Sequence, residues 1–326
     1  MDVYIDIGST NIKWKDTKDG KVRTTPFPAP IKSGEGRFEV PAEEILERVR
    51  SLVCGAARAF VSVQMHGYVL MKRGQAVTDY VSWRDERGKD LSPAFALTKE
   101  YGVDIKPNLP RLSLQAQTTE FDEFCTLGSY LAYRLTGNNS THITDAAPSG
   151  FYNVCKREKD AVPFRLPNER YKVERIGRYG ATEIYTPVGD QQAAILGAVG
   201  KDFDGYVLNL GTAGQLCCIA KGFETGEFES RPYFGGGTLC TVTRLAGGGE
   251  IKDYADGEIE DRLVEEYGLA IKRLPKRDKI LATGGVVKYR RELLCKVLER
   301  LGVEYAFNED CDALAGLEKI AKGEEE

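Results

Sequence analysis

The chain begins with alternating apolar and polar residues. This alternation runs from Val3 to Ile7, stops at the turn Gly8-Ser9-Thr10, and resumes over residues 11–15. The order predicts a β-hairpin rather than the strand-to-helix entry of a P-loop. Residues 205–218 repeat the sequence of strand, Gly-Thr turn and strand. Two such hairpins about half a chain apart predict two related halves that face each other across a cleft.

The remaining pattern mixes helical and extended spacing, which predicts an α/β protein. Helical spacing occurs in five segments: 41–52, 121–135, 258–267, 290–301 and 312–322. The segment 290–301 follows a buried strand and a Gly-Gly turn within 279–287. Residues 59–63 form a further buried strand by the same criterion. We expect loops at 144–150 and through most of 159–180.

Composition narrows the class of protein. The chain has 326 residues, 42% hydrophobic and 29% charged, with a net charge of -4. Its length favours two domains, and its charge argues against a nucleic-acid-binding surface. No apolar run approaches the roughly 18 residues of a membrane span. Eight cysteines without a Cys-x-x-Cys pair, beside two histidines, argue against zinc and for reduced thiols in the cytoplasm.

The stretch from Thr186 to Gly197 centres on Asp190. Gly189 permits a sharp turn, and the residues from Gln191 onward are rich in helix formers. Asp190 therefore lies at or near a helix N-terminus. It is either an N-cap residue or a general base on the floor of a cleft.

Other candidate residues follow predicted strands. The turn after the first strand could present backbone N–H groups to phosphate, with Asp6 placed to hold Mg²⁺ through water, although many such turns bind no phosphate. His66 follows a buried strand and is either a ligand contact or a core histidine. The segment from Trp83 to Arg87 suits a sugar but equally an exposed run of ion pairs. The Gly-Gly turn after the strand at 279–283 allows close approach of a nucleotide, or ordinary packing.

The ordered set of motifs resembles the FGGY carbohydrate kinases of the actin, hexokinase and Hsp70 superfamily. The resemblance covers nearly the whole chain, and it lies in these segments: Asp6-Ile-Gly-Ser-Thr10 with Lys13, Gln64-Met-His-Gly67, Trp83-Arg-Asp-Glu-Arg87, Gly189-Asp-Gln191, Leu210-Gly-Thr-Ala-Gly214, and Thr283-Gly-Gly285 with Lys288. It implies two actin-like (ribonuclease H-like) domains across a cleft, with a sugar-binding domain at 1–199 and a nucleotide-binding domain at 200–326.

The same resemblance implies transfer of the ATP γ-phosphoryl group to a sugar hydroxyl. Asp190 would be the catalytic base, and Asp6 would orient Mg²⁺. The sugar would be bound by Met65, His66, Trp83, Asp85 and Gln191. ATP would be bound by Gly8, Ser9, Thr10, Lys13, Gly211, Thr212, Gly284, Gly285 and Lys288.

Three short strings, at 149–153, 208–216 and 231–234, are most similar to sedoheptulokinases, which makes sedoheptulose the expected acceptor. The chain departs from the family at 154–185 and 249–279, which look abbreviated. Two alternatives stay open: an ATPase activator of a 2-hydroxyacyl-CoA dehydratase, which would hold an iron–sulfur cluster on cysteines, and a degenerate sugar or nucleotide sensor. The sequence also leaves a homodimer open.

Overall fold

The first hairpin forms as the alternation predicts. In the computed structural model, which describes residues 1–211, 213–252, 256–309 and 312–326, β1 (Asp2–Ile7) pairs antiparallel with β2 (Asn11–Asp16). The apolar residues of β1 are fully buried, because its sheet is covered on both faces. β6 (Arg58–Val63) lies parallel to β1 on its other side.

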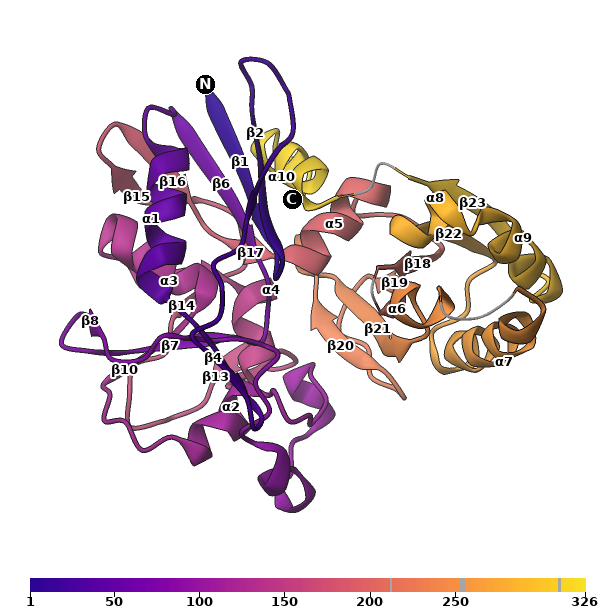
Figure 1. Cartoon of the computed structure of the whole chain (residues 1–326), viewed down its shortest axis with the longest axis horizontal. Coiled ribbons are helices and arrows are strands. Elements are labelled where there is room, and N and C mark those ends of the chain that lie inside the picture. Colours follow the sequence, from indigo (N-terminus) through magenta and orange to yellow (C-terminus); the bar gives the residue numbers. More distant parts are fainter. Residues whose placement is uncertain (212, 253–255, 310–311) are drawn as a thin grey trace.

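The second hairpin repeats this arrangement. β18 (Tyr206–Leu210) pairs antiparallel with β19 (Gly214–Ala220) and parallel with β22 (Lys279–Thr283). One sheet has the order β3 (Arg23–Pro26), β2, β1, β6 and β16 (Thr182–Tyr185). The other has the matching order β21 (Thr238–Leu245), β19, β18, β22 and β23 (Glu304–Asn308), with the same strand directions. The predicted α/β fold of two related halves is confirmed, and Figure 1 shows the two lobes side by side.

The other strands complete five sheets or ribbons. The first sheet adds β3 (Arg23–Pro26), β15 (Arg175–Tyr179), β16 (Thr182–Tyr185) and β17 (Val188–Gly189), and the second-lobe sheet adds β20 (Glu229–Pro232), β21 (Thr238–Leu245) and β23 (Glu304–Asn308). A further sheet holds β4 (Lys32–Gly34), β5 (Arg37–Val40), β7 (Tyr68–Lys72), β8 (Gln75–Ala76), β9 (Tyr80–Val81) and β10 (Glu123–Thr126). Two ribbons pair β11 (Ser140–His142) with β14 (Asn168–Arg170), and β12 (Tyr152–Asn153) with β13 (Glu158–Lys159).

The helices pack on these sheets. The α-helices are α1 (Ala42–Val53), α2 (Pro110–Ser113), α3 (Leu127–Thr136), α4 (Ile143–Ala146), α5 (Asp190–Val199), α6 (Gly248–Ile251), α7 (Asp256–Arg273), α8 (Gly285–Tyr289), α9 (Arg291–Arg300) and α10 (Ala313–Ala321). Short 3₁₀ turns are η1 (Lys89–Ala94), η2 (Lys99–Tyr101), η3 (Leu114–Ala116), η4 (Ala147–Ser149) and η5 (Phe234–Gly236).

Helices α5 and α10 lie between the two lobes (Figure 1). Their apolar residues share a core with Tyr4 and Phe60 of the first sheet and with Val207 of the second. The two helices touch at backbone distance, because a Cβ on Gly316 would lie 1.9 Å from the Ala193 carbonyl oxygen. Although α10 follows the second lobe in sequence, it therefore packs against elements of the first.

Three expected elements differ from the structure. Residues 121–135 are not one helix, because 123–126 form the buried strand β10 before α3 begins. The helix expected at 258–267 extends over the 18 residues of α7. The loop expected at 144–150 is helical, in α4 and η4.

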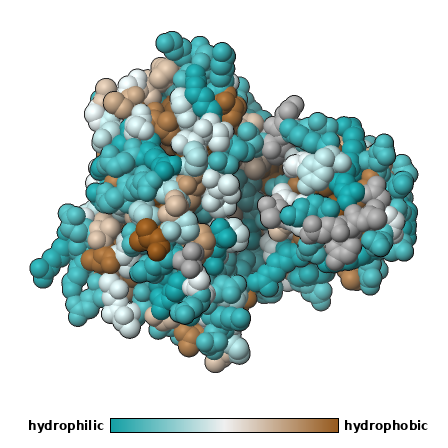
Figure 2. Space-filling view, in the orientation of Figure 1, coloured by the Kyte–Doolittle hydropathy of each residue, from teal (hydrophilic) through white to brown (hydrophobic). Residues whose placement is uncertain are grey.

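The surface is mostly hydrophilic and is hollowed between the lobes (Figure 2). Among the helices of the described residues, none is long and apolar enough to span a membrane.

Candidate active site

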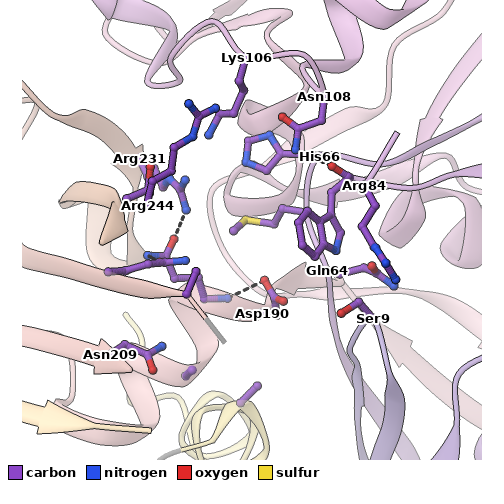
Figure 3. Close-up of a pocket in the computed structure, with 18 of the residues that line it drawn as sticks. Ser9, Gln64, His66, Arg84, Lys106, Asn108, Asp190, Asn209, Arg231 and Arg244 are labelled. Atoms are coloured by element: carbon purple, nitrogen blue, oxygen red, sulfur yellow. Dashed lines mark hydrogen bonds between the residues drawn. The ribbon is translucent and has the colours of Figure 1, made fainter. Parts of the chain in front are cut away.

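A cavity of about 960 Å³ lies between the lobes. Its size is in the usual range for small-molecule sites. Its lining residues come from both lobes, and Figure 3 shows several of them pointing into it. They are Asp6, Ser9, Lys13, Gln64, Met65, His66, Trp83, Arg84, Glu86, Lys106, Pro107, Asn108, Asp190, Gln191, Ala194, Asn209, Ala213, Gln215, Arg231, Thr243, Arg244, Asp312 and Ala313.

Asp190 lies in this cavity as the first residue of α5. Gly189 occupies the N-cap position, and among the described residues the Asp190 side chain accepts a hydrogen bond only from the adjacent Gln191 N–H, at 2.8 Å, so the N-cap interpretation is wrong. Gly189 is required by close packing, since a Cβ there would lie 2.8 Å from Met65 Sδ. The turn therefore presses the start of α5 against the loop that follows β6.

The surroundings of Asp190 favour its protonated form. Burial and the nearby Asp6 carboxylate raise the pKa of Asp190 to about 7, while the Gln191 N–H and Arg231 oppose the shift. Burial likewise raises the pKa of Asp6 to about 6, against the Ser62 hydroxyl and Lys13. A carboxyl group with a pKa near neutral pH is suited to accept and release a proton.

The first hairpin brings Asp6, Ser9 and Lys13 together at one side of the cavity. Asp6 and Lys13 are cross-strand partners in the register of β1 and β2, so their side chains share one face of the sheet. The Gly8 N–H is used within the turn, where it donates to the Asn11 carbonyl at 3.1 Å. Gly8 and the exposed Thr10 do not line the cavity, in contrast to Ser9 and Lys13.

The glycine turns of the second lobe meet at the carboxyl ends of β18 and β22. The Gly248 N–H donates to the Gly211 carbonyl at 2.8 Å, and a Cβ on Gly284 would lie 2.5 Å from the Leu210 carbonyl oxygen. Gly285 has open space around it. Gly211, Gly284, Gly285 and the exposed Lys288 belong to the second lobe but do not line the cavity. Thr212 lies outside the described residues.

His66 lies at another side of the cavity, in a backbone conformation that is uncommon for a residue with a side chain. Its φ is 63°. Burial, followed by Lys106 and Arg231, lowers the pKa of His66, so the ring is neutral. One ring nitrogen bonds to the Pro148 carbonyl, and Nδ1 is buried without a partner in the described structure. Nδ1 is therefore a buried acceptor that no described residue uses.

Met65, Trp83 and Gln191 also line the cavity, as expected of sugar contacts. Gln191 is held at both ends of its amide: Nε2 donates to Gln215 Oε1 at 2.5 Å, and Oε1 accepts from Arg231. The amide thus connects α5 with two strands of the second lobe.

The structure places Asp85 outside the cavity, so its expected sugar contact needs correction. Its side chain is 1% exposed and accepts hydrogen bonds from Arg87 Nε at 2.7 Å and from the Phe38 N–H at 2.8 Å. These bonds occupy both carboxylate oxygens. Asp85 stabilises the loop, while its neighbours Trp83, Arg84 and Glu86 face the cavity.

Several lining residues were not anticipated. Gln64 is 3% exposed, and its Oε1 has no partner among the described residues. Asn209 and Gln215 flank the second glycine turn, so their position beside a motif could have indicated them. Arg84 lies within the Trp83–Arg87 motif, whereas Lys106, Asn108, Arg244 and Asp312 lie in no motif.

The donors present fit a phosphate-bound Mg²⁺. Mg²⁺ prefers oxygen ligands and is commonly held by one or two carboxylates together with phosphate oxygens and water. Asp6 offers such a carboxylate at the cavity wall, with Oδ1 bonded to the Ser62 hydroxyl at 2.9 Å. No group of three or more His, Cys, Asp or Glu side chains among the described residues could enclose a metal.

Comparison with known proteins identifies the fold. No family model matches the sequence, and no curated protein does. Among solved structures, xylulose kinase from Lactobacillus acidophilus superposes with a TM-score of 0.82 at 18% identity, over 99% of this chain and 90% of that one. The chain has the fold of a sugar kinase. Gluconate kinase from the same organism superposes with a TM-score of 0.83 at 17% identity, over 100% of this chain and 90% of that one. Plasmodium falciparum glycerol kinase with ADP superposes with a TM-score of 0.80 at 12% identity, over 97% of this chain and 88% of that one.

Proposed function

We propose that this protein is an ATP-dependent carbohydrate kinase. The observation that carries the proposal is Asp190, a carboxyl group with a pKa of about 7 at the start of α5, in a cavity lined by both lobes. Ser9 and Lys13 line the same cavity and could contact phosphate groups. The fold shared with xylulose, gluconate and glycerol kinases supports this reading.

In the proposed reaction, a terminal sugar hydroxyl attacks the γ-phosphorus of ATP. Its oxygen forms the new P–O bond, the bond to the bridging oxygen of ADP breaks, and Asp190 accepts the hydroxyl proton. A positioned base contributes about 10²–10⁴-fold to such a step. Gln191, fixed by Gln215 and Arg231, holds the turn that orients the Asp190 carboxylate through its N–H.

The first hairpin would offset the charge of the phosphate groups. Lys13 supplies a positive charge, and Ser9 a hydroxyl donor, at the cavity wall. Asp6 would hold Mg²⁺, which would neutralise phosphate oxygens. The adenosine would lie against the Gly211, Gly284 and Gly285 turns of the second lobe, where Gly285 has open space at its Cβ position.

The sugar would bind beside Met65, His66 and Trp83. Sedoheptulose is the first neutral ketose to test, on the strength of the three sequence strings. Of these strings, 149–153 contributes no residue to the cavity, whereas Asn209, Gln215 and Arg231 of the other two line it. The support for sedoheptulose therefore rests on those two strings.

The cysteines disfavour a dehydratase activator. Cys217 and Cys218 are 1% and 0% exposed within β19, so neither is available to a cluster shared between subunits. The Cys217 thiol instead faces the Val207 carbonyl at 3.6 Å.

A coupled assay of ADP release tests the proposal. Purified protein with Mg-ATP would be offered ketoses, polyols and sugar acids, including sedoheptulose and xylulose, with Asp190→Asn as control. We expect release that depends on a sugar and is lost in the variant. ADP release that is equally fast without sugar contradicts the proposal. ADP release that is undiminished in Asp190→Asn also contradicts it. Silence with ATP still bound would favour a sensor.

A further inference from the structure

The part of the cavity beside His66 is rich in positive charge. Lys106, Arg231 and Arg244 all line the cavity, and Figure 3 shows them gathered on one side of the His66 ring. Glu229 is the buried counter-charge. Its carboxylate accepts from Lys106 Nζ at 2.6 Å and from Arg231 Nε at 2.7 Å.

The charges of this group do not balance. Lys106 and Arg231 are 9% and 5% exposed, and they share the single carboxylate of Glu229. The third partner, Gln191 Oε1, is a neutral acceptor. Buried charges are costly unless each is paired. One positive charge is therefore left in excess at the cavity wall.

Arg244 adds to this excess. Its side chain is exposed, and within the described part of the chain it has no hydrogen bond or ion pair. Its φ of 65° is uncommon for a residue other than glycine. Such conformations persist where the surrounding structure imposes them, often at ligand sites.

The acidic residues that line the cavity are Asp6, Glu86, Asp190 and Asp312. Asp6 raises the pKa of Asp190, and Asp312 raises that of Asp6, which places these three carboxylates near one another. In Figure 3, Asp190 lies toward Ser9 and away from Lys106, while Arg231, which opposes the raised pKa of Asp190, lies between the two groups. The cavity thus has an acidic side, where phosphoryl transfer is proposed, and a cationic side.

We propose that the acceptor sugar carries an anionic group, a carboxylate or a phosphate, which binds Lys106, Arg231 and Arg244 while a terminal hydroxyl lies at Asp190. This inference rests on the proposed kinase function and narrows its substrate class. It competes with neutral sedoheptulose as the acceptor. The anionic group takes no part in bond making: the hydroxyl oxygen gains phosphorus, Asp190 takes the proton, and ADP leaves.

Matched pairs of sugars test the proposal without ATP. Binding by isothermal titration would compare gluconate with glucitol, which differ in one carboxylate, and fructose 6-phosphate with fructose. One charge-assisted contact corresponds to roughly ten- to hundredfold tighter binding of the acid. Tighter binding of gluconate than of glucitol identifies the anionic group as a carboxylate. Tighter binding of fructose 6-phosphate than of fructose identifies it as a phosphate. Equal or weaker binding of both acids than of their neutral partners overturns the proposal.

Arg244→Gln tests the site itself. We expect the ratio of acid to neutral affinity to fall about tenfold. Arg73→Gln is the matched control, because Arg73 is also exposed with a positive φ, of 50°, but lies on the β7–β8 turn outside the cavity. An unchanged ratio in Arg244→Gln would remove Arg244 from the site.

The ADP-release assay separates the two proposals. Release with neutral sugars only would overturn the anionic acceptor and leave the kinase. Acid-selective binding with no release for any sugar would overturn the kinase and leave an acid-binding site.

Discussion

Replacing Asp190 with asparagine should make the protein more stable and much less active. Asparagine matches the size of aspartate but carries no charge, and in the native protein burial and Asp6 disfavour that charge. The shift of the pKa from 3.8 to about 7 would correspond to about 4 kcal/mol for a dry carboxylate. Asp190 is partly exposed to the cleft, so solvent screening reduces this penalty to roughly 1–2 kcal/mol.

The pH dependence gives the sign of this effect. The folded-state pKa of Asp190 is raised, so the penalty is complete above about pH 7, where the group is ionised in both states. It shrinks as the pH falls below 7, because the folded protein binds the proton first. It vanishes below about 3.8, where both states are protonated.

Urea denaturation of wild type and Asp190→Asn near pH 8 and near pH 4 measures this difference. We expect the variant to be more stable by roughly 1–2 kcal/mol near pH 8 and equal near pH 4, with turnover lowered at least about a hundredfold. Asp90→Asn, at an exposed position in η1, is the control for loss of a surface charge. A less stable Asp190→Asn protein near pH 8, or turnover within tenfold of wild type, would refute the reasoning.

Three further predictions follow from the same geometry. The profile of kcat/KM against pH should rise through about pH 7, because Asp190 must lose its proton to act as base. A profile that rises near pH 4 instead would count against Asp190 as the base. Gly189→Ala should destabilise the protein by about 1–3 kcal/mol and raise KM for the sugar, because the new Cβ displaces Met65. Thermal melting measures the loss of stability and steady-state kinetics the change in KM. A normal KM would argue against Met65 as a sugar contact. Gly316→Ala should lower the free energy of unfolding by about 3 kcal/mol or more, because the new Cβ separates α10 from α5. Gly257→Ala in α7, where a Cβ has open space, should instead stabilise the protein by up to about 1 kcal/mol. Similar melting temperatures for the two variants would contradict the packing argument.

The sequence predicted what local chemistry determines. The strand, glycine turn and strand recur because each is specified within about a dozen residues, and so both lobes could be anticipated. Asp6 and Lys13 share a hairpin, and hairpin register follows from the turn. Asp190 was indicated by the glycine before it and the helix formers after it.

Residues assembled by tertiary contacts could not be predicted. Lys106 lies in a loop of one lobe and Glu229 in a strand of the other, so no local pattern indicates that they pair. Asp85 and Glu86 are adjacent, and the pattern of charges does not say which faces the cavity. The strand at 123–126 was assigned to a helix because short apolar runs fit both periodicities.

The packing of α10 on α5 has a consequence for synthesis of the protein. Lys319 Nζ donates to the Leu196 carbonyl at 2.9 Å across 123 residues of sequence. At roughly 5–20 residues per second, the ribosome takes on the order of 6–25 s between these two helices. During that interval the apolar face of α5 lacks the helix that covers it in the folded protein. A nascent chain therefore cannot complete the cavity until residues 312–321 have emerged from the ribosome.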